Sequence, residues 1–372
     1  MLAILLGTRP EIIKMSPVIR ACERRSLDFL VIHTGQHYSY EMDRIFFEEL
    51  GLPEPAYNLD VGSGSHAEQT GSIMAGVEKI LLREKPGILL VQGDTNTVLA
   101  GALAASKCYV RRSGGGDRLL PLRTGHVEAG LRSFDRTMPE EINRIVADHL
   151  SDYCFAPTEL ARENLLREGI REGSIFVTGN TVVDAVRENL ALSRKKGDTL
   201  GDLGLRERGY LLVTLHRQEN VDSHPRLAGI LGALKHLHES SGLPVIFPVH
   251  PRTEKMARSF GLATDGLRIM KPLGYLEFLQ LESRARLVLT DSGGVQEESC
   301  ILGVPCVTLR DSTERPETVT VGANVVAGVA PASILEAAGL MMERSASWEN
   351  PFGDGRSGQR IVSLLCDRSE GG

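Results

Sequence analysis

The sequence predicts an α/β protein made of two domains, each built on a parallel sheet. Short apolar runs alternate with longer segments of helical period along the whole chain, which is typical of parallel strands joined by helices. The length, 372 residues, is also about that of two domains. Because both halves show the same alternation, we expect two Rossmann-like domains, with ligands bound beyond the carboxyl ends of the strands.

The expected strands are the short apolar runs. In the first half these are Leu2–Leu6, Phe29–His33, Ile88–Gln92, Tyr153–Ala156 and Ile175–Thr178. After a polar stretch at 195–208, strands are expected at Tyr210–Leu215, Val245–Val249, Leu267–Met270, Leu287–Thr290 and Cys306–Leu309.

Helices are expected between these strands. Pro10 suits the first turn of a helix, and Ser65 with Glu68 forms a capping box for a helix that extends to about Arg83. We expect an N-terminal domain at 1–178 and a C-terminal domain at 179–355. A last helix at about 356–368 is expected to pack back on the first domain.

Composition limits the classes of function. The net charge is −6 with 24% charged residues, so nucleic acid is not an expected partner. No targeting segment or apolar run of membrane-spanning length is visible. The six cysteines are scattered without a Cys-x-x-Cys pair, which suits reduced thiols. We therefore expect a cytoplasmic protein that is not associated with a membrane.

One turn predicts an anion site. An apolar run leads directly into Ser292, Gly293 and Gly294, where a helix begins, so backbone N–H groups and the positive end of the helix dipole point to one place. Glu298 lies where a helical carboxylate can reach a ribose diol, and Arg315 follows in a polar loop. The expected ligand is a nucleoside diphosphate, although Ser-Gly-Gly alone is equally typical of a simple turn.

Polar residues that follow the first-half strands are further candidates. Arg9 and Lys14 come after the first strand and suit a diphosphate, or equally a carboxylate of a helix. Asp94 follows the strand at 88–92, where spacing alone favours a helix N-cap.

With an ordinary strand order, Asp94, Glu128 and Glu140 share one face of the crevice and can divide acid and base roles. The alternative for Glu140 is a pair with Arg144 along its own helix. His216 ends a second-half strand and can bind a phosphate or protonate a leaving group, although a lone histidine is more often structural.

Two patterns are set aside. Gly62-x-Gly64-x-x-Ala67 matches a loose dinucleotide fingerprint but follows a poor strand and lacks the acidic residue after the next one, so no nicotinamide cofactor is expected. No histidine pair has metal-ligand spacing, so no built-in metal is expected. The glycines at 114–116 interrupt a helix-to-strand connection and are expected to form an exposed flexible loop.

Together the motifs resemble the non-hydrolysing UDP-N-acetylglucosamine 2-epimerase family, from one end of the chain to the other. The motifs occur in the family's order and are Gly7-Thr8-Arg9-Pro10-Glu11, Thr34-Gly35-Gln36-His37, Gly93-Asp94-Thr95, His126-Val127-Glu128-Ala129-Gly130-Leu131-Arg132, Pro139-Glu140-Glu141-x-Asn143-Arg144, Thr290-Asp291-Ser292-Gly293-Gly294-x-Gln296-Glu297-Glu298 and Thr313-Glu314-Arg315-Pro316-Glu317.

The resemblance implies a glycosyltransferase-B-like, cofactor-free isomerase, usually a homodimer. Its active site would lie in the cleft between the two domains, with UDP held mainly by the second domain. By motif match, Ser292, Gly293 and Gly294 bind the diphosphate, Glu298 the ribose and Arg315 a phosphate. Leu273 and Phe278 wall the uracil. The residues around the sugar and diphosphate are Arg9, Lys14, Asp94, Glu128, Glu140, Arg144 and His216. The family's allosteric site is not mapped onto 36–40, and the glycine loop is an addition.

The implied reaction interconverts UDP-N-acetylglucosamine and UDP-N-acetylmannosamine by elimination of UDP to 2-acetamidoglucal and re-addition. The product would supply N-acetylmannosamine for polysaccharide or glycan synthesis. Asp94 and Glu128 are the expected proton-transfer pair, Glu140 supports them, and His216 stabilises the leaving UDP with Arg9 and Arg315. The alternatives are a hydrolysing 2-epimerase, an epimerase for a UDP-diacetamido or uronic sugar, a glycosyltransferase, and a catalytically silent UDP-sugar sensor.

Overall fold

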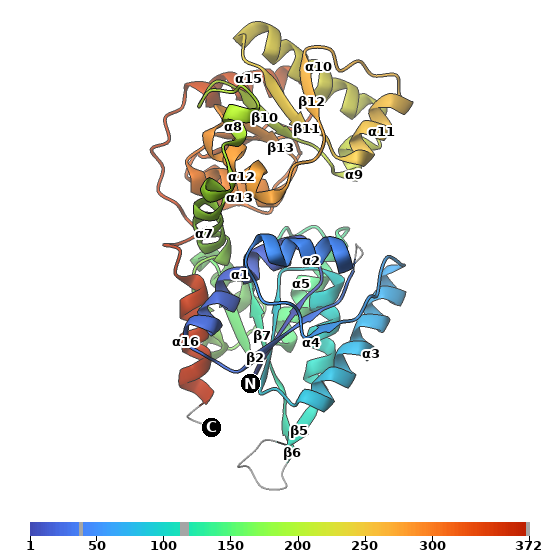
Figure 1. Ribbon diagram of the computed structural model, residues 1–372, viewed down its shortest axis with the longest axis vertical. Helices are drawn as coiled ribbons and strands as arrows, with labels where there is room; N and C mark the ends of the chain where they lie inside the picture. The colour runs from blue at the N-terminus through green and yellow to red at the C-terminus, as the bar shows by residue number, and fades with distance from the viewer. Residues whose placement is uncertain (37–39, 112–118, 370–372) are drawn as a thin grey trace. The chain divides into compact units, whose positions relative to one another are not determined.

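The computed structural model describes residues 1–36, 40–111 and 119–369, and these form two compact units (Figure 1). One unit contains Met1–Ala185 and the segment that begins at Phe352, and the other contains Val186–Pro351. The expected flexible loop at 112–118 and the motif residues at 37–39 lie outside the described residues.

The first unit is built on a parallel sheet. Within the described residues its strand order is β3-β2-β1-β4-β7-β8-β9, and every neighbouring pair is parallel. The strands are β1 (Leu2–Leu6), β2 (Phe29–His33), β3 (Tyr57–Asn58), β4 (Ile88–Gln92), β7 (Arg123–Val127), β8 (Tyr153–Ala156) and β9 (Ile175–Val177). Two antiparallel strands, β5 (Tyr109–Arg111) and β6 (Leu119–Pro121), pair with each other on either side of the gap in the described residues.

Helices connect and cover this sheet. They are α1 (Arg9–Arg24), α2 (Tyr40–Glu49), α3 (His66–Glu84), α4 (Asn96–Ser106), α5 (Pro139–Leu150), α6 (Glu159–Arg167) and α16 (Ser357–Ser369), with a 3-10 turn at Glu172–Ser174. The capping box that predicts the start of α3 is present at Ser65 and Glu68. Helix α16 packs on α1, where Gly358 lies against Pro17.

The second unit repeats this design with the strand order β12-β11-β10-β13-β14-β15, again parallel throughout. The strands are β10 (Leu211–Thr214), β11 (Val245–Pro248), β12 (Leu267–Met270), β13 (Leu287–Thr290), β14 (Cys306–Thr308) and β15 (Asn324–Val326). The helices are α8 (Thr199–Asp202), α9 (Gln218–Val221), α10 (His224–Ser241), α11 (Pro251–Ser259), α12 (Tyr275–Arg284), α13 (Gly293–Leu302), α14 (Pro316–Thr320) and α15 (Pro331–Glu343). Helix α7 (Thr181–Lys196) contains the boundary between the units.

Both sheets therefore have the Rossmann order, which confirms the predicted fold class. The strand order reverses between β1 and β4 in the first unit and between β10 and β13 in the second. Two adjacent loops leave each sheet in opposite directions at such a point, and ligands of this fold bind there.

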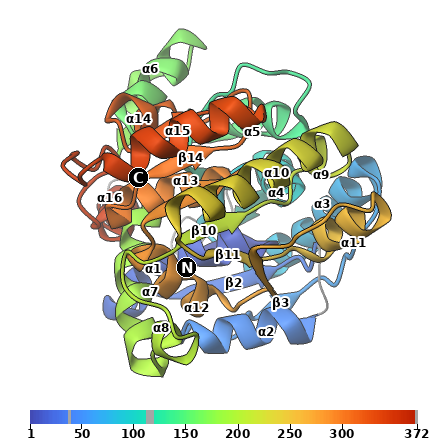
Figure 2. The ribbon, with the colours of Figure 1, turned by 90° about the horizontal axis from the view of Figure 1, so that it is seen from above.

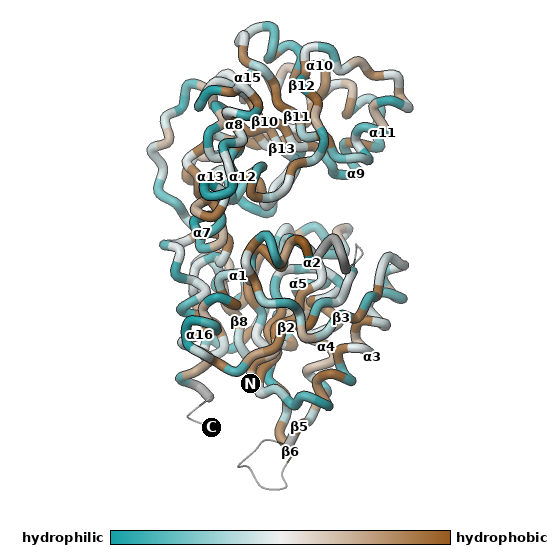
Figure 3. Tube along the Cα trace, viewed as in Figure 1, coloured by the Kyte–Doolittle hydropathy of each residue, from teal (hydrophilic) through white to brown (hydrophobic). Residues whose placement is uncertain are grey.

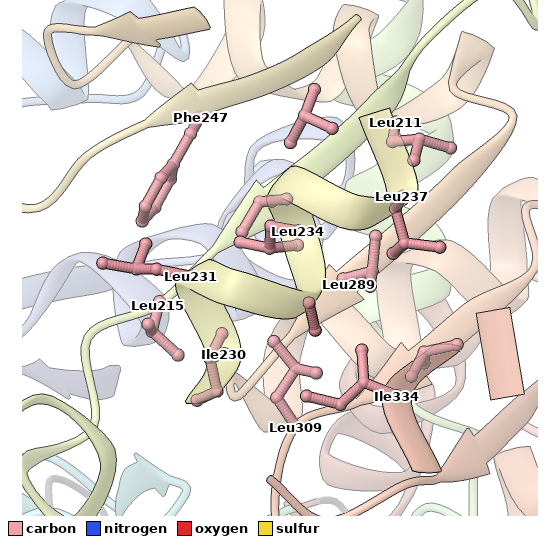
Figure 4. Packing of buried hydrophobic residues seen from close by; sticks show 14 of the residues in the cluster. Leu211, Leu215, Ile230, Leu231, Leu234, Leu237, Phe247, Leu289, Leu309 and Ile334 are labelled. Atoms are coloured by element: carbon pink, nitrogen blue, oxygen red, sulfur yellow. The ribbon is translucent and has the colours of Figure 1, made fainter. Parts of the chain in front are cut away.

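The strands are mainly apolar, whereas the helices around them mix apolar and polar residues along their length (Figure 3). In the second unit, α10 and α15 lie side by side over one face of the sheet (Figure 2). Leu231, Leu234 and Leu237 of α10 pack there against Leu211 and Leu289 of the strands (Figure 4). Among the described helices, none is long and apolar enough to cross a membrane.

This core gives a stability prediction. Leu234 is fully buried, so Leu234→Ala should lower the free energy of unfolding by about 2–5 kcal/mol. The matched control, Leu340→Ala on α15, removes a side chain that is 58% exposed and should change it by less than about 0.5 kcal/mol. Urea unfolding followed by the fluorescence of Trp348, the single tryptophan, reports on this unit. Equal losses in both variants would contradict the assigned core.

Candidate functional site

In the first unit, a buried carboxylate joins the two loops at the point where the strand order reverses. Glu11 accepts hydrogen bonds from the N–H groups of Gly7 (2.5 Å) and Thr8 (2.8 Å), and from Thr95 Oγ1 (2.5 Å) across the reversal. These hydrogen bonds lower the pKa of Glu11, but burial has the larger effect and raises the pKa overall, to about 7. Glu11 is not among the predicted site residues, but the Thr8-x-x-Glu11 spacing is a capping-box signal that identifies it.

Glu128 follows β7 and is held by three side chains. Lys14 Nζ lies 2.5 Å from its Oε1, Asn180 donates to the same oxygen at 3.3 Å, and Gln92 donates to Oε2. Glu128 has a left-handed backbone, with φ of 74°, which is unfavourable for a residue with a long side chain. Gln92 and Asn180 are not among the predicted residues, since isolated amides carry no sequence signal.

Asp94 follows the neighbouring strand, β4. Arg144 Nη2 lies 2.5 Å from its Oδ2, and Asn143 donates to its carbonyl at 2.8 Å. The N-cap interpretation of Asp94 is wrong, because α4 begins at Asn96 and Thr95 is its N-cap. Asp94 lies one residue before the N-cap, so its carboxylate does not cap the helix and pairs with Arg144.

Glu140 lies in the first turn of α5, about one turn before Arg144. Arg144 binds Asp94 and also Glu141, which accepts the N–H groups of Ser133 and Phe134. Arg9 opens α1, with its guanidinium 5.8 Å from the centre of the Phe46 ring.

A buried histidine fixes the loop that carries Asp94. His126 lies between Asp148 Oδ1, at 2.6 Å from its Nδ1, and the carbonyl of Gly93, at 2.8 Å from its Nε2. Burial lowers the pKa of His126, but the charge of Asp148 and the two hydrogen bonds outweigh this and raise it overall. The Oε2 of Glu128 lies 3.8 Å from where a Cβ on Gly93 would be, so the Asp94 loop and the Glu128 carboxylate are adjacent.

In the second unit, Asp291 makes the equivalent connection across the reversal. It accepts the N–H groups of His216 (3.1 Å) and Arg217 (2.9 Å) after β10, and His216 Nδ1 lies 3.0 Å from its Oδ1. Burial raises the pKa of Asp291, but these hydrogen bonds from His216 and Arg217 hold it below its usual range. The His216 ring is 43% exposed, so it is anchored on one side and accessible on the other.

The predicted anion turn opens α13, with Ser292 as N-cap and the N–H groups of the first turn without helical acceptors. A Cβ on Gly293 would lie 2.3 Å from Glu314 Oε1, so a larger residue there would displace the Glu314 carboxylate. Glu314 pairs with Arg310 at 2.7 Å and with Arg217 at 3.5 Å. The turn is therefore bordered by a cluster of arginines whose charge is partly balanced by a buried carboxylate.

The remaining second-unit candidates lie on α12, α13 and the loops beside them. Arg315 Nε lies 2.9 Å from Glu297 Oε1, and Tyr275 donates to Glu298 Oε1 at 3.0 Å. Leu273 and Phe278 are half-buried against the apolar cluster under α12. No group of three or more metal-ligating side chains is found within the described ranges.

Comparison with known proteins connects these features to one family. The family model described as UDP-N-acetylglucosamine 2-epimerase matches residues 20–366. The chain belongs to this family. The UDP-N-acetylglucosamine 2-epimerase of Methanocaldococcus jannaschii is 54% identical over 98% of both chains. A Pseudomonas aeruginosa UDP-2,3-diacetamido-2,3-dideoxy-D-glucuronate 2-epimerase is 42% identical over 97% of this chain and 98% of its own.

Solved structures agree in fold. The crystal structure of the M. jannaschii UDP-GlcNAc 2-epimerase in complex with UDP-GlcNAc and UDP matches with a TM-score of 0.88 and 54% identity, covering 98% of this chain and 99% of that one. The Neisseria meningitidis UDP-GlcNAc 2-epimerase bound to UDP-GlcNAc matches with a TM-score of 0.87 and 32% identity, over 98% and 99%. The predicted family, isomerase class and glycosyltransferase-B-like fold are thus confirmed.

The arginine cluster predicts an acid-sensitive contribution to stability. Burial raises the pKa of Glu314, but Arg315, Arg310 and Arg217 lower it to about 2, against an ordinary 4.5. This depression stabilises the fold above pH 4.5 by about 3 kcal/mol, and the contribution is lost as pH falls towards 2.

Glu314→Gln should therefore be less stable than the unchanged protein at pH 6, and the difference should shrink at pH 3. Urea unfolding followed at Trp348 measures both, with the exposed Glu336→Gln as control. A difference that stays constant with pH would contradict the assignment.

Proposed function

We propose that this protein interconverts UDP-N-acetylglucosamine and UDP-N-acetylmannosamine by inverting C2 without net hydrolysis. The observation that carries the proposal is the pair of carboxylates, Asp94 and Glu128. They follow the neighbouring strands β4 and β7, and each forms an ion pair with a basic side chain. The relatives named UDP-N-acetylglucosamine 2-epimerase, at 54% and 51% identity, support the choice of sugar.

The chemistry requires an elimination. The C2 hydrogen of an N-acetylhexosamine is not adjacent to a carbonyl, so simple deprotonation has a high barrier. We infer that a carboxylate removes the C2 proton while the C1–oxygen bond to UDP breaks, which leaves a double bond between C1 and C2. UDP then adds back to C1 as a proton is delivered to the opposite face of C2.

The first unit supplies the proton transfers in this proposal. Asp94 and Glu128 act on C2, and Glu140 supports them from α5. Arg144 and Lys14 orient the two carboxylates, since each is fixed on its partner at 2.5 Å. Arg9 assists departure of the diphosphate.

The second unit holds the nucleotide. The turn at Ser292, Gly293 and Gly294 receives the diphosphate at the start of α13. Arg315 binds a phosphate, His216 stabilises or protonates the leaving group, and Glu298 receives the ribose diol. Leu273 and Phe278 flank the uracil. Since both units contribute residues, we propose that turnover needs both. We also propose that the enzyme is a cytoplasmic homodimer. Its product would supply N-acetylmannosamine units for polysaccharide or glycan synthesis.

A second candidate substrate is favoured by one comparison. The 42% identity to the Pseudomonas aeruginosa diacetamidoglucuronate 2-epimerase means that a UDP-diacetamido uronic acid fits the same chemistry. Incubation with each UDP-sugar, with release of free UDP monitored, distinguishes these substrates and separates epimerisation from hydrolysis.

The elimination predicts solvent exchange. With UDP-N-acetylglucosamine in deuterium oxide and no additives, the UDP-N-acetylmannosamine formed should carry deuterium at C2, as seen by proton NMR. A product that keeps its original C2 hydrogen would rule out the elimination.

The carboxylate roles predict a separation of turnover from binding. Asp94→Asn and Glu128→Gln should each lower kcat by about 10²–10⁴-fold, because a general acid or base is lost. UDP affinity, measured by calorimetry, should change little, since UDP is assigned to the other unit. Glu159→Gln, at a 73% exposed position, is the control. Loss of UDP binding in either site variant would show that its assigned role is wrong.

A further inference from the structure

A buried polar cluster lies between α12 and α13, and Glu298 is its only member among the described residues with a role in the proposed function. Tyr275 and Glu282 are about two turns apart on α12 and so project from the same side of the helix. Glu298 and Ser299 project from α13, which packs against α12. Glu282 and Ser299 are fully buried, and Glu298 is 8% exposed.

The contacts of this cluster form a chain. Tyr275, which is hydrogen-bonded to the side chain of Asn189, donates to Glu298 Oε1 at 3.0 Å. Ser299 Oγ donates to Glu282 Oε1 at 2.9 Å. The second oxygen of Glu282 is buried and is reached by no N–H or hydroxyl group of the described residues, whereas the carboxyl group of Glu298 is within hydrogen-bonding reach.

Two adjacent buried carboxyl groups share a proton, because burial and the repulsion between like charges make it unfavourable for both to be ionised. Burial and the charge of Glu298 raise the pKa of Glu282 well above its usual range, and the Ser299 hydrogen bond only partly opposes this. The other titratable groups nearby are the Tyr275 phenol, the Tyr210 phenol and the Cys306 thiol, whose pKa values burial raises. All three stay neutral. Glu298 accepts a hydrogen bond from Tyr275 and is the more exposed of the two carboxyl groups, so it keeps the negative charge and Glu282 carries the proton.

We propose that Glu282 is a positioning residue for the nucleotide: as a neutral carboxylic acid it donates a hydrogen bond to Glu298 and fixes the carboxylate that receives the ribose diol. This inference rests on the proposed function, in which Glu298 binds the ribose. Glu298 is then held by two donors, Tyr275 and Glu282, and its remaining lone pairs have a set direction.

A fixed carboxylate discriminates between sugars. The two oxygens of the carboxylate can accept from the two vicinal hydroxyl groups of a ribose. A 2′-deoxyribose lacks one of these hydroxyl groups, so one hydrogen bond of the carboxylate is not formed. Glu282 should therefore determine how strongly the protein prefers ribonucleotides, and not only how well it folds.

The test compares UDP with 2′-deoxy-UDP by calorimetry. Glu282→Gln keeps a donor towards Glu298 and an acceptor for Ser299, so the ratio of the two Kd values should stay within about twofold of the unchanged protein. Glu282→Leu removes the donor, so the UDP Kd should rise about tenfold while that of 2′-deoxy-UDP changes much less. Glu336→Leu, at an exposed position on α15, is the control.

A second readout reports the proton directly. The infrared difference spectrum of the unchanged protein minus Glu282→Gln at neutral pH should contain a carbonyl band of a protonated carboxylic acid. This readout does not depend on Glu282→Leu folding, and absence of the band would overturn the proposal.

The nucleotide outcomes are also decisive. Equal weakening of both nucleotides by Glu282→Leu would reduce Glu282 to a structural role and overturn the inference. If the unchanged protein itself fails to discriminate UDP from 2′-deoxy-UDP, the ribose role of Glu298 is wrong and the inference is overturned with it. C2 epimerisation itself is tested separately by the deuterium experiment.

Discussion

In both units a buried carboxylate bridges the point where the strand order reverses, and the rest of each site depends on this bridge. Glu11 joins the loops after β1 and β4, and Asp291 joins those after β13 and β10. The paired loops run away from each other and cannot complete each other's backbone hydrogen bonds. Glu11 accepts hydrogen bonds from both of its loops, and Asp291, which itself follows β13, accepts them from the loop after β10, so each carboxylate fixes two loops relative to each other.

A second shared feature is that the site cations are already paired. Lys14 with Glu128, Arg144 with Asp94 and Arg315 with Glu297 place charges in defined directions. Side chains held in this way lose little rotamer freedom when a ligand arrives. The pairing also agrees with the net charge of −6, since the positive charges are placed by local arrangement and not by a large basic surface.

The sequence predicts the apolar parts of this structure well and the polar parts less well. Leu2–Leu6, Phe29–His33 and Leu287–Thr290 form strands with the expected bounds. Strand β7, Arg123–Val127, has no apolar run: the buried ring of His126 is paired with Asp148, and the backbone N–H of Thr124 donates to Asp152. The motifs identify Asp94 and Glu128 as candidates. Gln92 and Asn180, which donate hydrogen bonds to Glu128, are single polar residues that belong to no motif, so only the fold shows that they lie beside it.

The left-handed backbone of Glu128 has a consequence for the evolution of this chain. Nearby Gly130 adopts a similar φ of 83° without strain, and glycine or asparagine would suit position 128 better than glutamate does. The glutamate conformation costs on the order of 1–3 kcal/mol, but replacing this residue would also remove the ion pair of the buried Lys14. Directed evolution towards heat resistance therefore meets two opposing effects at position 128, relief of the backbone and loss of the ion pair, and the glutamate is kept or replaced according to which effect is larger.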